Sequence, residues 1–139
     1  MKPMQGIPIL LVLAAGGLAA QDTTQQMAAA PSLSVEAVVA RDVVDRMPVD
    51  SGSTFPADVG TLVCWTRVTG APAGVDTELH HVWFHGDHQV ADVVLRPAGS
   101  PWRTWSRKTV VPEWTGPWRV EVRDAAGTVL STVSFTVGM

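Results

Sequence analysis

The stretch "PWRVEVRDAAGTVLSTVSFTV", residues 117–137, decides the fold class. In its first half apolar residues alternate with charged ones, and the apolar set is Trp118, Val120 and Val122. The second half repeats the alternation with Val129, Val133, Phe135 and Val137. The "DAAG" between them supplies a turn, in which Gly127 is free to adopt positive φ. The stretch therefore predicts an antiparallel hairpin with one buried face.

Outward from this hairpin, the chain is a series of short extended runs with no sustained helical periodicity. We expect strands at 34–45, 60–69, 79–85, 88–96, 102–111, 117–124 and 128–137. The separators are rich in glycine, proline and aspartate, as turns require. About seven strands at this spacing predict an all-β fold, an immunoglobulin-like antiparallel β-sandwich, over residues 33–139.

The N-terminal residues are predicted to lie outside that domain. Lys2 precedes an apolar run, and small residues follow at the end of it, which predicts a signal peptide over 1–20. Residues 21–32 have a composition typical of a flexible leader. We expect a periplasmic or secreted mature protein without a transmembrane span, because the run is shorter than the roughly 20 residues that a span needs. A retained membrane anchor is the alternative.

Cys64 is the single cysteine, so the chain cannot form an intramolecular disulfide. It shares one face of the predicted strand 60–69 with Leu62, Thr66 and Val68. This position predicts a buried, unreactive thiol.

The predicted hairpin at 79–96 turns at "GD" and carries all four histidines of the chain. A two-residue turn there pairs His85 with His88, Trp83 with Val90, and His81 with Asp92. We assign the more apolar face to the core, and this face consists of Val82, Phe84, Ala91, Val93 and Leu95. The outer face then holds His81, Trp83, His85, His88 and Asp92, although a slip of one residue would invert the assignment.

Residues 101–122 contain four of the chain's six tryptophans and a concentration of positive charge. Residues 96–123 carry six basic side chains and two acidic ones, whereas the whole chain has a net charge of −3. Neither face of the predicted strand 102–111 is a plain core surface, so at least one of Trp102 and Trp105 is expected to be partly exposed.

Several stretches together resemble a bacterial domain of unknown function, the one numbered twenty-nine fourteen. The resemblance covers roughly residues 34–139, and its most specific block is W-R-T-W-S-x-K followed by G-x-W-x-V-x-V. The matching stretches are "VCWTRVTG" (63–70), "HHVWFHGDHQVADVVL" (80–95), "WRTWSRKTVVPEWTGPWRVEVRDAAGTVL" (102–130) and "SFTV" (134–137). The resemblance implies an exported or membrane-attached protein, with no established activity or catalytic residues to transfer.

The sequence contains no nucleophile elbow, no His-Glu-x-x-His, no phosphate loop and no paired-carboxylate signature, so we expect neither an enzyme nor a cofactor. We expect an exported, non-catalytic interaction module whose partner is an envelope protein, a peptide or a glycan. Export and net negative charge argue against nucleic acid. The candidate ligand-binding residues are Trp102, Arg103, Trp105, Arg107, Lys108 and Trp83. The alternative for the same residues is a structural clasp of arginines stacked on tryptophans.

A second candidate function is weak copper or zinc handling by His85 and His88. Side chains directly opposite each other in a hairpin have Cβ atoms about 4.5–5.5 Å apart, close enough for two imidazoles to share one ion. A solvated hairpin tip is the competing interpretation.

Overall fold

A computed structural model describes residues 33–138, and the predicted signal peptide (1–20) and leader (21–32) lie outside them. Within the described residues, no helix is long and apolar enough to cross a membrane. The strands are β3 (Ser34–Ala40), β4 (Asp42–Val44), β5 (Met47–Val49), β6 (Thr54–Phe55), β7 (Gly60–Thr69), β8 (Leu79–His85), β9 (His88–Leu95), β10 (Trp102–Val110), β11 (Gly116–Asp124) and β12 (Val129–Val137).

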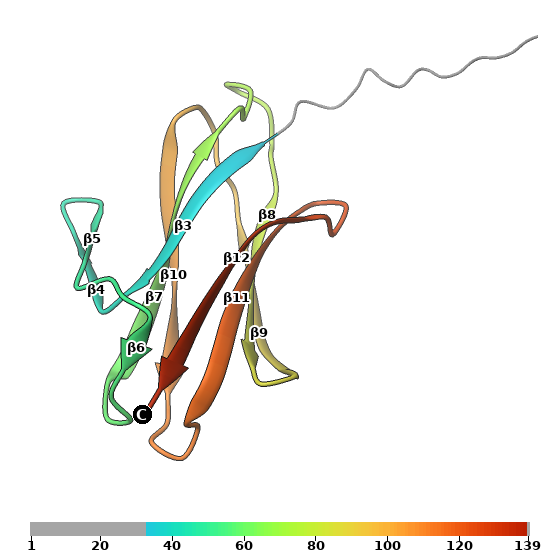
Figure 1. The fold of residues 1–139 in the computed structure, drawn as a ribbon. Coiled ribbons are helices and arrows are strands. Elements are labelled where there is room, and N and C mark those ends of the chain that lie inside the picture. The colour runs from blue at the N-terminus through green and yellow to red at the C-terminus, as the bar shows by residue number, and fades with distance from the viewer. Residues whose placement is uncertain (1–32, 139) are drawn as a thin grey trace, which may run out of the picture. The chain divides into compact units, whose positions relative to one another are not determined.

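The strands form two sheets and a separate small hairpin (Figure 1). One sheet has three strands in the order β10-β7-β3, the other has five in the order β6-β12-β11-β8-β9, and β4 pairs with β5 alone. All pairs are antiparallel except β6 with β12. Apolar side chains from both sheets meet in one buried cluster, so the domain is the all-β sandwich that the sequence predicts.

Phe135 is the centre of the aromatic part of this cluster. Its ring packs edge-on against Phe55 and Trp83, with 5.9 and 6.3 Å between ring centroids, and it stacks on Trp118 at 5.9 Å. Such pairs contribute about 0.5–1.5 kcal/mol each beyond the area they bury. Cys64 lies in the same cluster, and burial raises the pKa of its thiol to about 12, which confirms the predicted unreactive cysteine.

Six of the seven predicted strands begin and end within one residue of the observed ones, and the first prediction, 34–45, is wrong. β3 ends at Ala40, and the chain then forms the β4–β5 hairpin. Asp45 and Arg46 turn this hairpin with φ angles of 53° and 66°. Two successive residues with positive φ are the backbone of a type I′ turn, in which the second residue is usually glycine, so the Asp-Arg pair does not predict the turn locally.

The faces of the C-terminal hairpin are largely as predicted. Trp118, Val120 and Val122 are buried, as are Phe135 and Val137, and Val133 is half-buried. Val129 is instead exposed, because the register between β11 and β12 shifts next to Val122 and Arg123. The shift turns Leu130, in place of Val129, toward a second apolar cluster, whose buried residues are Val68, Leu79 and Val122.

The predicted faces of β8 are inverted. His81 and Trp83 are fully buried between the sheets, whereas Val82 and Phe84 lie on the other face. Phe84 is nevertheless buried there, since the guanidinium of Arg119 covers its ring at 3.9 Å. Both faces of β8 are therefore covered, and alternation of apolar residues could not distinguish them.

The predicted pairing of the β8–β9 hairpin holds only at its tip. His85 does pair with His88, but a bulge at Val90 moves the remaining pairs by one residue. Trp83 pairs with Ala91 and His81 with Val93, so the predicted Trp83–Val90 and His81–Asp92 pairs are wrong.

Replacement of Trp83 by alanine should lower the free energy of unfolding by about 3–5 kcal/mol, because it leaves a cavity in the centre of the core. Trp105 is half-buried on the outside of the three-stranded sheet, so Trp105→Ala should lower the free energy of unfolding much less. Urea unfolding of the two variants beside the unaltered protein measures the difference. Equal losses would contradict this account of the core.

Candidate functional site

The predicted binding residues of β10 lie on two opposite faces of the strand. Trp102 and Lys108 point into the sandwich, where Trp102 packs against the second apolar cluster and Lys108 Nζ lies 5.7 Å from the Trp114 ring centroid. Arg103, Trp105 and Arg107 alternate with them and lie on the outer face of the sheet. The predicted single surface is therefore wrong. The prediction of partial exposure is confirmed, since both Trp102 and Trp105 are half-buried.

Trp83 does not lie on an outer surface at all. Its side chain is fully buried, and its indole Nε1–H donates to Ser106 Oγ across the sandwich at 3.1 Å. A side chain in this position cannot contact a ligand, so the prediction that Trp83 lies on a binding face is wrong.

The register of β10, β7 and β3 arranges the outer face in rows. Trp105 lies opposite Trp65, and Arg103 lies opposite Arg67. Glu36 of β3 continues the arginine row on the far side of Arg67. The outer face thus carries two tryptophans in one row, of which Trp65 is buried, and two adjacent arginines in the next.

The β4–β5 hairpin is fixed to this face at its turn. The indole of Trp65 donates from Nε1 to the carbonyl of Arg46 at 2.9 Å. Arg46 in turn donates from Nη2 to the carbonyl of Arg103 at 3.1 Å, and its guanidinium lies 5.8 Å from the ring centroid of Trp105. These contacts hold a non-glycine residue in the left-handed region, where the backbone costs roughly 1–2 kcal/mol.

Two further contacts join the hairpin to β10. Arg103 Nη1 donates to the sulfur of Met47 at 3.2 Å, and Arg107 Nη1 donates to Asp42 Oδ1 at 3.4 Å. The hairpin projects from the side of the three-stranded sheet (Figure 1). It exposes three apolar side chains, with exposed fractions of 53% for Val44, 47% for Met47 and 37% for Val49.

We call this surface the arginine face. It consists of Arg46, Met47, Arg67, Arg103, Trp105 and Arg107. Sequence reasoning found its β10 members but missed Arg46, Met47 and Arg67, which come from the β4–β5 hairpin and from β7. Only the pairing of the strands brings these residues together, and no local sequence pattern predicts that they are neighbours.

A second polar group that the sequence analysis missed surrounds His80. Its Nδ1 lies 2.7 Å from Asp92 Oδ1 and its Nε2 lies 2.5 Å from Glu78 Oε2. The hydrogen bonds to Asp92 and then Glu78 raise the pKa of His80 above its ordinary value. The two carboxylates lie on opposite sides of the ring, so they hold an imidazolium and do not converge on a common ion.

His81 forms a buried hydrogen-bond network between the two sheets. Its Nδ1 lies 2.7 Å from Ser106 Oγ, and its Nε2 lies 2.7 Å from Thr66 Oγ1. Burial lowers the pKa of His81 to about 4. A serine hydrogen-bonded to a histidine resembles part of a hydrolase site, but these side chains are enclosed in the core, where no substrate reaches them. The network is structural.

The predicted metal-binding histidines meet at the hairpin tip, but one of them is already engaged. His85 Nε2–H donates to the carbonyl of Thr115 at 2.7 Å, and the ring stacks on Trp114 with 5.8 Å between centroids. Only Nδ1 of His85 is then available to a metal. Residues 33–138 contain no group of three or more histidine, cysteine, aspartate or glutamate side chains placed to hold an ion. Copper or zinc handling by His85 and His88 stays a prediction.

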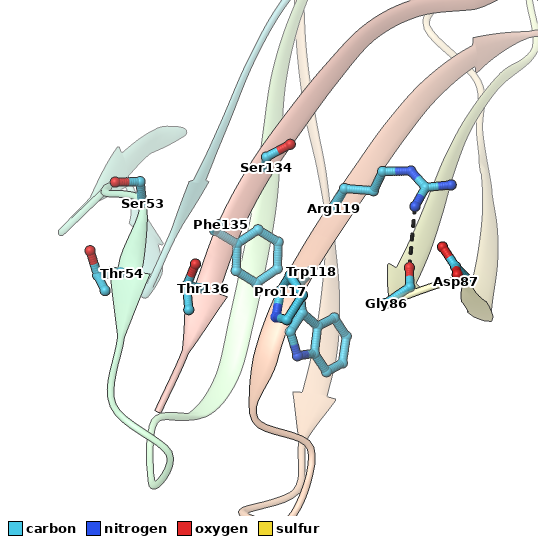
Figure 2. Close-up of a pocket in the computed structure, with 10 residues that line it drawn as sticks. All are labelled: Ser53, Thr54, Gly86, Asp87, Pro117, Trp118, Arg119, Ser134, Phe135 and Thr136. Carbon is cyan, nitrogen blue, oxygen red and sulfur yellow. Dashed lines mark hydrogen bonds between the residues drawn. The ribbon is translucent and has the colours of Figure 1, made fainter. Parts of the chain in front are cut away.

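The outer side of the five-stranded sheet contains a shallow pocket of about 530 Å³ (Figure 2). Arg119 lies at its rim and donates from Nη1 to the carbonyl of Gly86 at 3.2 Å. The aromatic residues Trp118 and Phe135 line it only from below, because both are buried in the core. The remaining lining residues are mostly small and polar: Ser53, Thr54, Asp87, Pro117, Ser134 and Thr136. None of these residues forms a nucleophile and base pair.

Comparison with known proteins identifies the fold and leaves the activity open. A family described as "Protein of unknown function (DUF2914)" matches residues 76–137, which include β8 to β12. This supports a domain of unknown function in kind, over a shorter span than the predicted 34–139. No curated protein sequence matches the chain.

Solved structures resemble the chain in fold. An immunoglobulin-like protein from Pseudomonas aeruginosa is 17% identical with a TM-score of 0.52, and the match covers 78% of this chain and 98% of that one. The predicted immunoglobulin-like sandwich is thereby confirmed. A beta-glucosidase from Listeria innocua, solved with isofagomine, is 10% identical with a TM-score of 0.46, and the match covers 16% of that chain.

The stability of the protein should fall as the pH drops from about 6.5 to about 4. Unfolded His81 titrates near the ordinary histidine pKa of 6.5, whereas the folded state keeps it neutral down to about 4. The unfolded state therefore binds more protons in this window, and about 3 kcal/mol of stability is lost across it. Urea unfolding at several pH values measures the slope, which His81→Gln should flatten. His80→Gln should leave this slope unchanged, because the pKa of His80 is raised and its effect on stability falls at pH values above this window.

Copper or zinc should bind the hairpin tip only weakly, with dissociation constants no tighter than micromolar, because two imidazoles leave most coordination positions to water. Calorimetric titration of the protein and of a His85→Ala, His88→Ala double variant measures this. Tight stoichiometric binding that the double variant loses would favour metal handling. Binding that the double variant retains would exclude this site.

Proposed function

We propose that this chain is a non-catalytic interaction module of the bacterial envelope and that the arginine face binds a partner protein or peptide. The observation that carries the proposal is the half-exposed Trp105, which arginines surround and which a strained hairpin flanks with exposed apolar side chains. Tryptophan and arginine are the residues most enriched where binding energy concentrates. Left-handed backbone at non-glycine residues is found preferentially at functional sites.

A protein or peptide is favoured over a glycan as the partner. Sugars stack on open aromatic rings, but the guanidinium of Arg46 already lies over the Trp105 ring. The exposed valines and methionine of the hairpin add apolar area beside the arginines, which suits a polypeptide surface with mixed character.

Two features support a non-catalytic role in the envelope. The hydrogen-bonded histidine and serine are enclosed in the core, and the pocket in Figure 2 is shallow and has no activated nucleophile. The apolar run before residue 20 predicts export, which would bring the domain to the periplasm or the exterior.

Site-specific photo-crosslinking in living bacteria that express the full chain tests the proposal. A photoreactive amino acid at Met47 should give discrete adducts with a partner protein. The same residue at Val129 is the matched control, since the two positions are 47% and 46% exposed and lie on different sheets. Adducts specific to Met47 that Trp105→Ala abolishes would support the proposal. Equal adducts at both positions, or none at Met47, would contradict it.

A further inference from the structure

We propose that the segment recognised by the arginine face is acidic: an extended polypeptide stretch whose carboxylates pair with Arg46, Arg67 and Arg103. This inference rests on the proposed function and adds the chemical class of the partner to it.

These three guanidinium groups lack carboxylate partners. The ion pairs among residues 33–138 involve His80, Arg96, Arg107, Arg119 and Arg123. Arg46, Arg67 and Arg103 take part in none of them. The chain has thirteen acidic residues and a net charge of −3, so these arginines lack partners because of where the acidic residues lie and not because acidic residues are few.

The fold also holds like charges close together. Arg67 and Arg103 are directly opposite each other on neighbouring antiparallel strands. Their Cβ atoms are then about 4.5–5.5 Å apart, and like charges in such pairs are destabilising. Arg46 adds a third guanidinium through a turn with φ of 66°, and its hydrogen bond to the Arg103 carbonyl keeps it in the same patch. An anion bound between these groups would relieve their repulsion.

The nearest acidic side chains do not serve this purpose. Asp42 pairs with Arg107 at 3.4 Å, at the other end of the arginine face. Glu36 lies opposite Arg67 in the register, but it makes no ion pair with it. A positive area therefore stays open between the hairpin and β10.

The shape of the area suits an extended segment. β10 is the edge strand of its sheet, so one side of its backbone has no ladder partner within the described strands. A segment lying along β10 would place alternate side chains on the same face at intervals of about 7 Å. Carboxylates at alternate positions would then reach successive guanidinium groups, which bind carboxylates through paired hydrogen bonds. The intervening apolar side chains would point to the other side of the segment, because successive residues of a strand face opposite ways.

The probe is a synthetic peptide of alternating glutamate and valine residues, and its control has glutamine in place of each glutamate. Titration calorimetry at low salt should show binding of the glutamate peptide only, and the affinity should fall as the ionic strength rises. Arg67→Gln and Arg103→Gln should each weaken binding about tenfold, as expected from the loss of one hydrogen bond between charged groups. Arg96→Gln is the matched control, because Arg96, which follows β9, already pairs with Asp76.

Arg67→Gln is the most informative of these variants. Arg67 is exposed and makes none of the side-chain hydrogen bonds that fix the hairpin, and it lies opposite another arginine, so its replacement should keep or slightly raise the melting temperature. Arg46→Gln removes a hydrogen bond that holds the turn, and it is used only as a comparison.

The outcomes separate this inference from the proposed function. If the glutamine peptide binds as well as the glutamate peptide, or if neither binds while adducts at Met47 persist, the acidic specificity is wrong and the interaction module stands. If the protein binds vesicles containing phosphatidylglycerol but neither peptide, the ligand is a lipid surface and the inference is overturned. If Met47 adducts and peptide binding both fail, both proposals fall.

Discussion

The hydrogen bonds of His81 to Ser106 and Thr66 determine which way the central strands face. A buried imidazole needs a partner for each ring nitrogen, and an unpaired buried polar group costs about 1–3 kcal/mol. Ser106 and Thr66 must therefore point into the sandwich. Because strand residues alternate, this direction places Trp105, Arg103 and Arg107 on the outside of β10. The arginine face thus follows from a polar contact in the core.

The same alternation explains which parts of the fold the sequence predicts. Where one face of a strand is wet and charged, as in β11, Trp118 and Val120 identify the core directly. In β8 the pattern fails, because Phe84 on the outer face is covered by Arg119 from the neighbouring strand. Such cover depends on which strands are neighbours, and that information is not local. The β4–β5 turn was missed for a different reason: Arg46 adopts positive φ, which arginine rarely does, and no glycine follows Asp45 to mark the turn.

The candidate site was predictable only in part. The density of tryptophan and arginine directs attention to β10, and strand periodicity separates Trp102 and Lys108 from the outer residues. The rest of the arginine face is assembled across strands. Arg67 is placed by the register of β7, and Arg46 is placed by a hydrogen bond from Trp65, nineteen residues away in sequence. Neither residue stands in a motif that a sequence pattern could detect.

The two faces of the three-stranded sheet therefore differ in what they contribute to the protein. The inner face carries the buried side chains Cys64, Thr66 and Ser106, on which stability depends. The outer face carries charged groups whose repulsion and strained turn oppose folding slightly. Trp65 belongs to the outer face by its register and is nevertheless buried, and it donates the hydrogen bond that holds Arg46 in place. The core strand β7 thereby fixes the position of the hairpin in advance. Binding at the arginine face would then not include the entropy cost of ordering the hairpin.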